Sequence, residues 1–174
     1  VESAKTHAPS HITFDVRIAE GVPPVAADKD RARQVLVNLV ENAVKYSPDG
    51  GTIEVGLEAA DNSVRFSVVD EGMGIPSHEQ ARIFEKFYRL DPNLTSGIGG
   101  TGLGLSISQN LVALMGGELT VCTAPHQGTE FEFSVVTPLA AAPSEPQTAE
   151  ASAERSARIR ARNLQVLVAE DNSI

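Results

Sequence analysis

A single amphipathic helix constrains the fold of this chain more than any other feature of the sequence. Between residues 28 and 46, apolar side chains recur at steps of three and four, which is the spacing of a helix with one buried stripe. Asp28 is placed to cap its first turn. The helix is expected to end near Tyr46, because the segment that follows (SPDGG, residues 47–51) cannot continue a helix.

Strand-like segments lie on both sides of this helix. Residues 11–18 alternate apolar and polar side chains, so Ile12, Phe14, Val16 and Ile18 are expected to share one face of a strand. Turn signals separate the later segments, as in hairpins. The strands expected from these patterns span residues 11–18, 52–59, 63–70, 118–124 and 129–136.

Two further helices are expected between the strands. Ser77 and Gln80 occupy the capping-box positions of a short helix. A longer helix is expected to start near Gly102 and to stop at residues 116–117, whereas residues 91–101 lack periodicity and are expected to form a mobile loop. Helices that interleave with hairpins predict an α+β sandwich.

Composition excludes some classes of function. The net charge of −9, with 14 Lys and Arg in 174 residues, argues against a nucleic-acid-binding protein, which needs clustered cations. Cys122 has no second cysteine to pair with, and we expect it to be a buried strand residue. The sequence has neither an apolar run of membrane-spanning length nor a signal peptide. Since it begins with Val1 and not with Met, we expect it to be a fragment of a longer parent protein. The fragment is expected to be cytoplasmic, and the sequence does not say whether the parent is anchored in a membrane.

The composition changes after Pro138. Residues 139–163 are rich in Ala, Pro, Ser and Glu, which is typical of a linker. Residues 164–174 are expected to form an apolar strand that runs into Glu170 and Asp171. The expected organisation is a linker remnant at residues 1–10, a globular domain at residues 11–138, a linker at residues 139–163 and the terminal strand at residues 164–174.

Polar residues border the apolar stripe of the first long helix. At one hundred degrees per residue, Asn38, Asn42 and Lys45 fall within about sixty degrees of each other. The Asn42 carbonyl oxygen suits a hard cation such as Mg²⁺, Lys45 offers a cation for phosphate, and Glu41 lies beside it. The alternative is that these side chains simply face water, as polar stripes usually do.

Asp70 ends an apolar strand and is followed by a turn with the sequence EGMGIP. A buried carboxylate there suits an amine donor such as that of adenine. Gly72 and Gly74 would let the backbone approach a flat ligand closely. An acid that merely ends a hairpin strand before a turn is the alternative.

A glycine-rich segment precedes the second long helix. Five of the chain's 14 glycines lie within residues 97–104, and amides at a helix N-terminus, together with glycines, form a phosphate site. The segment has neither the lysine of a P-loop nor the dinucleotide fingerprint, and flexible loops also use glycines. Upstream, the aromatic side chains of residues 84–89 (FEKFYR) are expected to pack a loop, while Lys86 and Arg89 can reach phosphates.

Together and in this order, the motifs resemble the catalytic domain of sensor histidine kinases, in the superfamily that includes gyrase, heat-shock chaperone and mismatch-repair ATPases. The segments similar to its N box, first Gly box, F box and second Gly box are NLVENAVKYS, DEGMGIP, FEKFYR and GTGLGL. The resemblance covers residues 11–138. It implies a Bergerat-type two-layer sandwich, with a mixed, mostly antiparallel sheet backed by helices and Mg-ATP under a lid at residues 91–101.

The resemblance also implies roles for the matching residues. Asn38 and Asn42 would hold the phosphates and the metal, with Asn42 as the metal ligand, and Asp70 would accept a hydrogen bond from the adenine amine. The set implied for nucleotide binding is Asn38, Asn42, Lys45, Tyr46, Asp70, Gly72, Gly74, Ile75, Lys86, Arg89, Gly100, Thr101, Gly102, Leu103 and Gly104. The set implied for catalysis is Asn38, Glu41, Lys45 and Arg89.

One position separates the branches of this superfamily. Its hydrolysing members place a Glu base four residues before the metal-binding Asn, where this chain has Asn38. Asparagine takes no proton, so the resemblance favours phosphoryl transfer to a protein over ATP hydrolysis. None of the four histidines lies in a phosphoacceptor motif. We therefore expect the acceptor on a separate dimerisation domain of a homodimeric parent, and the chain by itself to be a monomer.

The segment VLVAEDNSI (residues 166–174) resembles the first strand of a response-regulator receiver, with Glu170 and Asp171 as its metal-site acids. The parent is therefore interpreted as a hybrid kinase that works with a receiver domain or response regulator, although an incidental strand is the alternative. Two other functions stay open: an ATP-binding regulatory or pseudokinase module without phosphotransfer, and a serine kinase of the anti-sigma type.

Overall fold

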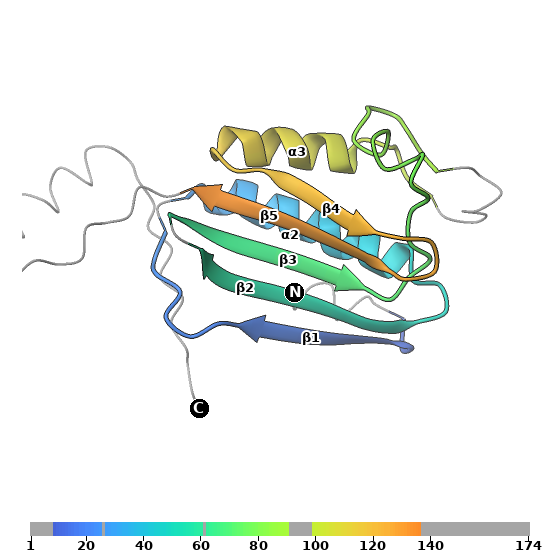
Figure 1. The fold of residues 1–174 in the computed structure, drawn as a ribbon, viewed down its shortest axis with the longest axis horizontal. Coiled ribbons are helices and arrows are strands. Elements are labelled where there is room, and N and C mark those ends of the chain that lie inside the picture. The colour runs from blue at the N-terminus through green and yellow to red at the C-terminus, as the bar shows by residue number, and fades with distance from the viewer. Residues whose placement is uncertain (1–8, 26, 61, 91–98, 137–174) are drawn as a thin grey trace, which may run out of the picture.

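The computed structural model describes residues 9–136 apart from residues 26, 61 and 91–98, and these form two layers (Figure 1). One layer is a sheet with the strand order β1-β2-β3-β5-β4. β1 is parallel to β2, and the other neighbours are antiparallel. The elements are β1 (Ile12–Ile18), α2 (Lys29–Lys45), β2 (Gly51–Ala60), β3 (Ser63–Asp70), α3 (Gly104–Leu114), β4 (Leu119–Thr123) and β5 (Thr129–Val136).

The second layer consists of the two helices, which cover one face of the sheet. α2 packs on β3 and β2, and α3 packs on β4, β5 and α2. The predicted α+β sandwich, with a mixed, mostly antiparallel sheet backed by helices, is confirmed. Neither of the helices described is long and apolar enough to cross a membrane. The predicted linker at residues 139–163 and the receiver-like strand at residues 164–174 lie outside the described residues, as does most of the remnant at residues 1–10.

α2 follows the predicted pattern. One carboxylate oxygen of Asp28 accepts hydrogen bonds from the backbone N–H groups of Asp30 and Arg31, each at 3.1 Å, so the expected cap is present. The apolar stripe is buried, with Val35 and Leu39 fully covered. At its C-terminal end, the carbonyl oxygen of Tyr46 accepts a hydrogen bond of 3.1 Å from the backbone N–H of Met73, so this end lies beside the loop that follows β3.

The core lies between the helices and the inner face of the sheet. Phe133 of β5 is fully buried, and its ring stacks on that of Phe66 in β3 with centroids 4.7 Å apart. The apolar face of β1 is covered only in its first half, because Val16 is 43% exposed and Ile18 66% exposed. The core is therefore thickest under β3 and β5, the strands that lead into the loops described below.

The prediction of a short helix that starts at Ser77 is wrong. Residues 77–87 form consecutive turns and bends. Gln80 does not complete a capping box, because its Nε2 donates to the carbonyl oxygens of Ile75 at 3.1 Å and Thr123 at 3.0 Å. The side chain thus ties this segment to the end of β4 instead of stabilising a helix.

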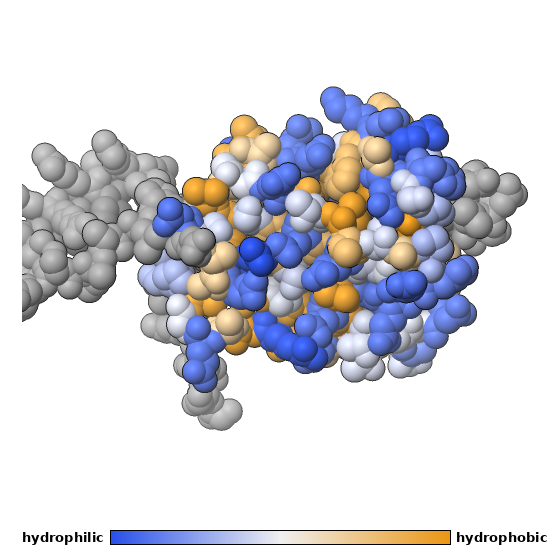
Figure 2. Space-filling view, in the orientation of Figure 1, coloured by the Kyte–Doolittle hydropathy of each residue, from blue (hydrophilic) through white to orange (hydrophobic). Residues whose placement is uncertain are grey.

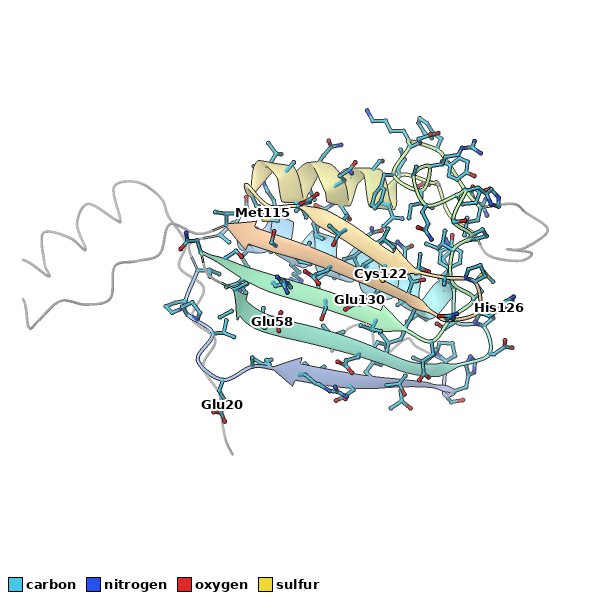
Figure 3. All side chains as sticks on the ribbon, viewed as in Figure 1. Glu20, Glu58, Met115, Cys122, His126 and Glu130 are labelled. Carbon is cyan, nitrogen blue, oxygen red and sulfur yellow. The ribbon has the colours of Figure 1, made fainter. Side chains whose placement is uncertain are left out.

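Cys122 lies on a strand, as predicted, but it is exposed and not buried. It pairs with Glu130 in the antiparallel register of β4 and β5 (Figure 3). The alternation of β4 turns Leu119 inward and Cys122 outward. The uncovered face on which it lies is largely hydrophilic (Figure 2), and it carries ion pairs such as that of Arg65 with Glu132 at 2.7 Å.

Candidate functional site

A cavity of about 350 Å³ opens between the C-terminal ends of α2 and β3 and the N-terminal end of α3. The loop that follows β3 closes its side. This volume lies within the range of sites for small ligands, about 300–1,000 Å³. Its lining residues are Asn38, Glu41, Asn42, Lys45, Tyr46, Asp70, Gly74, Ile75, Ile83, Tyr88, Arg89, Leu90, Gly100, Thr101, Gly102, Gly104, Leu105, Thr129 and Phe131.

Asp70, the last residue of β3, supplies a buried carboxylate to the cavity wall. It is 5% exposed, and its Oδ1 accepts hydrogen bonds from the backbone N–H groups of Gly72 at 2.9 Å and Thr129 at 3.2 Å. Burial raises the pKa of Asp70 to about 6, and the two hydrogen bonds only partly oppose this shift. The side chain also lines the cavity, so it can accept a hydrogen bond from a ligand.

Two cationic side chains, Lys45 and Arg89, also line the cavity. Burial lowers the pKa of Lys45, and the neighbouring Arg89 lowers it further, while Glu41 acts in the opposite direction. The Lys45 Nζ lies 5.3 Å from the ring centroid of Tyr46. Burial raises the pKa of Tyr46, with Arg89 opposing. Two cations that raise each other's electrostatic energy form a site that an anion would stabilise.

The start of α3 adds backbone donors to this cationic region. The helix begins at Gly104, and no side chain caps its first turn. Uncapped amides at a helix N-terminus favour an anion. A Cβ at Gly104 would displace the side-chain oxygen of Asn38. Gly74, which also lines the cavity, has φ +65°, and a Cβ there would collide with the backbone of Ala124.

The asparagines on α2 differ in their surroundings. The Asn38 Nδ2 donates a hydrogen bond of 2.9 Å to the hydroxyl of Ser108 on α3. Asn42 lies one turn later and lines the cavity. An amide oxygen at this position suits a cation that takes most of its ligands from phosphates and water. Glu41 lines the same wall, so the cavity carries charges of both signs.

Most of the residues predicted for the site line this cavity, although their chemical roles stay predictions. Three do not line it. Gly72 lies behind Asp70 and donates to it, Leu103 is the N-cap residue of α3, and Lys86 is exposed on the segment outside the cavity. The expected packing of the aromatic segment is wrong for Phe87, which is 72% exposed and has φ 64°.

Sequence patterns missed several residues of the cavity wall. Thr129 and Phe131 come from β5, whose pairing with β3 brings Thr129 opposite Asp70. Tyr88 lines the cavity, and the guanidinium of Arg82 lies 4.1 Å from its ring centroid. The other missed residues are Ile83, Leu90 and Leu105. Their apolar character was visible in the sequence, but only the three-dimensional pairing shows that they face a cavity.

Residues 27–139 match the family described as histidine kinase-, DNA gyrase B- and HSP90-like ATPase. The chain is 44% identical over 119 residues to the adaptive-response sensory kinase SasA of a Nostoc species, an alignment that covers 68% of this chain and 29% of that protein. It is 36% identical over 127 residues to the sensor histidine kinase WalK of Bacillus subtilis, covering 72% and 21% respectively. The chain thus spans less than a third of the length of these relatives.

Solved structures of sensor histidine kinases share this fold. The mycobacterial sensor histidine kinase MprB superimposes with a TM-score of 0.66 at 30% identity, covering 78% of this chain and 88% of that one. Full-length ShkA in complex with AMPPNP gives a TM-score of 0.67 at 33% identity, covering 98% of this chain and 39% of that one. From the family match and the identities to sensor kinases, this chain belongs to the histidine kinase-, DNA gyrase B- and HSP90-like ATPase family.

Proposed function

We propose that this domain binds Mg-ATP and supplies its γ-phosphoryl group to a histidine on a separate dimerisation domain, in two-component signalling. The observation that carries the proposal is the set of polar groups that line one cavity. A buried carboxylate, Asp70, lines it together with the cations Lys45 and Arg89 and the uncapped N-terminus of α3. The carboxylate can accept a hydrogen bond from adenine, and the cations and helix amides suit a triphosphate.

The base end suits adenine. Asp70 presents an acceptor held by two backbone amides, which matches the exocyclic amine of adenine and opposes the carbonyl that guanine has at that position. Ile75 and Phe131 contribute apolar wall to the same cavity, and Tyr46 is placed to flank the ring. These groups bind and orient the base without taking part in the chemistry.

The phosphate end suits charge stabilisation. Lys45 and Arg89 line the cavity near Gly100, Gly102 and the first turn of α3. These donors hold the phosphates in position, which is the main protein contribution to phosphoryl transfer. Transfer breaks the bond between the γ-phosphorus and its bridging oxygen and forms a bond to a histidine nitrogen, with ADP as the leaving group. The acid next to the acceptor histidine is the proposed base.

The residues fit a magnesium ion that is shared with the nucleotide. Asn42 is an amide oxygen donor on the cavity wall, and Mg²⁺ commonly takes one or two protein ligands together with phosphate oxygens and waters. Asn42 would hold the ion, and the ion when bound would neutralise phosphate charge. Glu41 adds a carboxylate to the same wall.

Asn38 favours transfer over hydrolysis. It lies where hydrolysing relatives carry a glutamate base, and its amide is hydrogen-bonded to Ser108. An amide cannot take a proton from water. The proposed partners are a histidine-bearing dimerisation and phosphotransfer domain and a receiver domain or response regulator, with a homodimeric parent and a monomeric isolated domain. Sedimentation that shows a concentration-independent dimer would contradict the last point.

The proposal is tested first by calorimetric titration of the domain with Mg-ATP. We expect binding that guanine nucleotides do not reproduce. The second step adds a dimerisation domain from a sensor kinase and γ-labelled ATP. Labelled phosphate on the acceptor that is stable to base and lost in acid supports histidine phosphorylation. Acid-stable label indicates a serine kinase, and tight ATP binding with no label indicates a regulatory module.

A further inference from the structure

The side chain of Asn38 lies in the seam between the two helices. Its Nδ2 donates to the Ser108 hydroxyl at 2.9 Å, and Ser108 is only 1% exposed. Its Oδ1 packs on the Cα of Gly104, where a Cβ would collide with it. Gly104 and Ser108 are four residues apart, so they present one face of α3 to Asn38. The carboxamide is therefore held at both ends by the same helix.

The two ends of this carboxamide have different surroundings. The nitrogen points to a buried hydroxyl one turn into α3, whereas the oxygen lies at the first residue of the helix. Asn38 and Gly104 both line the cavity. The nitrogen is therefore turned toward Ser108, and the oxygen lies beside Gly104, a residue of the cavity wall. An amide rotated by 180° would exchange these two groups.

We propose that Ser108 is a positioning residue for the phosphate end of the site: by accepting a hydrogen bond from Asn38, it keeps the Asn38 carbonyl oxygen directed toward the bound magnesium–phosphate group. This inference rests on the proposed Mg-ATP site. Oxygen is the ligand that Mg²⁺ and its water shell accept, whereas an amide N–H repels the ion. Ser108 itself touches neither nucleotide nor metal.

A neighbouring serine provides a matched comparison. Ser106 is also buried on α3, but its hydroxyl donates to the carbonyl oxygen of Leu103 within its own helix, at 2.9 Å. Removing either hydroxyl deletes one oxygen from a buried position of the same helix. Only the Ser108 hydroxyl contacts Asn38. A difference between the two variants therefore isolates the bond between the helices from the general effect of losing a buried hydroxyl.

The test compares Ser108→Ala, Ser108→Thr and Ser106→Ala in calorimetric titrations of ATP with Mg²⁺ and with EDTA. The dissociation constant in EDTA divided by that in Mg²⁺ measures how much the metal strengthens ATP binding. We expect Ser108→Ala to lower this ratio about fivefold, the size of one net hydrogen bond. Ser108→Thr keeps the hydroxyl, so its ratio should equal that of the unmodified domain. The proposal would be overturned if Ser108→Ala weakened ATP binding equally with and without metal, or if Ser106→Ala lowered the ratio by the same factor.

A second readout does not depend on nucleotide. In the free domain, the side-chain NH₂ signals of Asn38 in a nitrogen–proton NMR spectrum should exchange slowly with water and should shift and exchange faster in Ser108→Ala. In an Asn38→Ala background, Ser108→Ala should have no further effect on the metal ratio. Unchanged Asn38 signals would refute the positioning role while leaving nucleotide binding intact. Failure of the unmutated domain to bind ATP would instead refute the proposed function.

Discussion

Replacing Asp70 by asparagine should strengthen the fold and weaken the site at the same time. The pKa of Asp70 in the folded domain is about 6, raised from 3.8 chiefly by burial. A shift of about two units corresponds to about 3 kcal/mol, because each unit is worth about 1.4 kcal/mol. The charged carboxylate therefore destabilises the nucleotide-free fold by about that amount at neutral pH. Asparagine keeps an oxygen that can accept from the Gly72 and Thr129 amides but carries no charge.

The sign of the pH dependence follows from the raised pKa. Between pH 3.8 and about 6 the folded state holds the Asp70 proton more tightly than the unfolded state does. The free energy of unfolding therefore falls as the pH rises through this window and changes no further above it. Asp70→Asn lacks this contribution. Its stability advantage over the unmodified domain should be small near pH 4, grow up to about pH 6 and then level off at about 1–3 kcal/mol.

The assay is urea unfolding of both proteins from pH 4 to 8, with calorimetric titration of Mg-ATP on the same samples. The other ionisable groups of the cavity, Glu41, Lys45 and Arg89, are present in both proteins, so their contributions largely cancel in the difference. ATP affinity should fall about tenfold or more in Asp70→Asn, since a lost charged hydrogen bond is worth about 1.5–3 kcal/mol. A stability difference that does not vary with pH, or a variant less stable at every pH, would refute the reasoning.

Three further substitutions test other parts of the molecule. Lys45→Met should weaken ATP binding about tenfold or more while leaving adenosine binding unchanged, because only the phosphates lose a cation; equal losses in calorimetry would contradict this. Gly104→Ala should drive the Asn38 carboxamide away from α3, since a Cβ there meets its oxygen, and Mg-ATP titration should show weaker binding although alanine favours the helix by about 1 kcal/mol. Phe133→Ala should lower the free energy of unfolding by about 3–5 kcal/mol, because the ring is fully buried against Phe66; a urea midpoint within error of the unmodified protein would contradict the assigned core.

Local patterns predicted those elements whose chemistry is contained in neighbouring residues. α2 was predictable because its cap, its apolar stripe and its stop signal all lie within residues 28–51. The strand ending at Asp70 was predictable for the same reason. The glycine-rich start of α3 was also visible, although the helix begins at Gly104 and not at Gly102. In each case the period of the side chains and the turn residues agree with the final structure.

Long-range contacts decided the features that the sequence did not reveal. Gln80 matches a capping box, but its amide donates to two backbone carbonyls, one in the loop after β3 and one at the end of β4, so the capping box does not form. Thr129 looks like an ordinary strand residue until the register of β5 places its N–H on Asp70. Cys122 shares a face of its strand with Thr120, opposite Leu119 and Val121, so the alternation already indicated an outward side chain. The expected burial followed the usual preference of a free cysteine and was wrong.

The cavity wall contains side chains whose charges are unfavourable in the nucleotide-free fold, next to an apolar core. The carboxylate of Asp70 is buried, and the positive charge of Arg89 acts unfavourably on that of Lys45. The core residues of α2 and the sheet supply the stability that keeps these groups in place. A ligand that donates a hydrogen bond to Asp70 and brings negative charge to the cations offsets both unfavourable interactions. Its binding stabilises the folded state, and at high ligand concentration this stabilisation grows with the logarithm of the concentration. The residues that weaken the free fold are thus the ones through which a nucleotide would be recognised, which is why substitutions there should change stability and affinity in opposite directions.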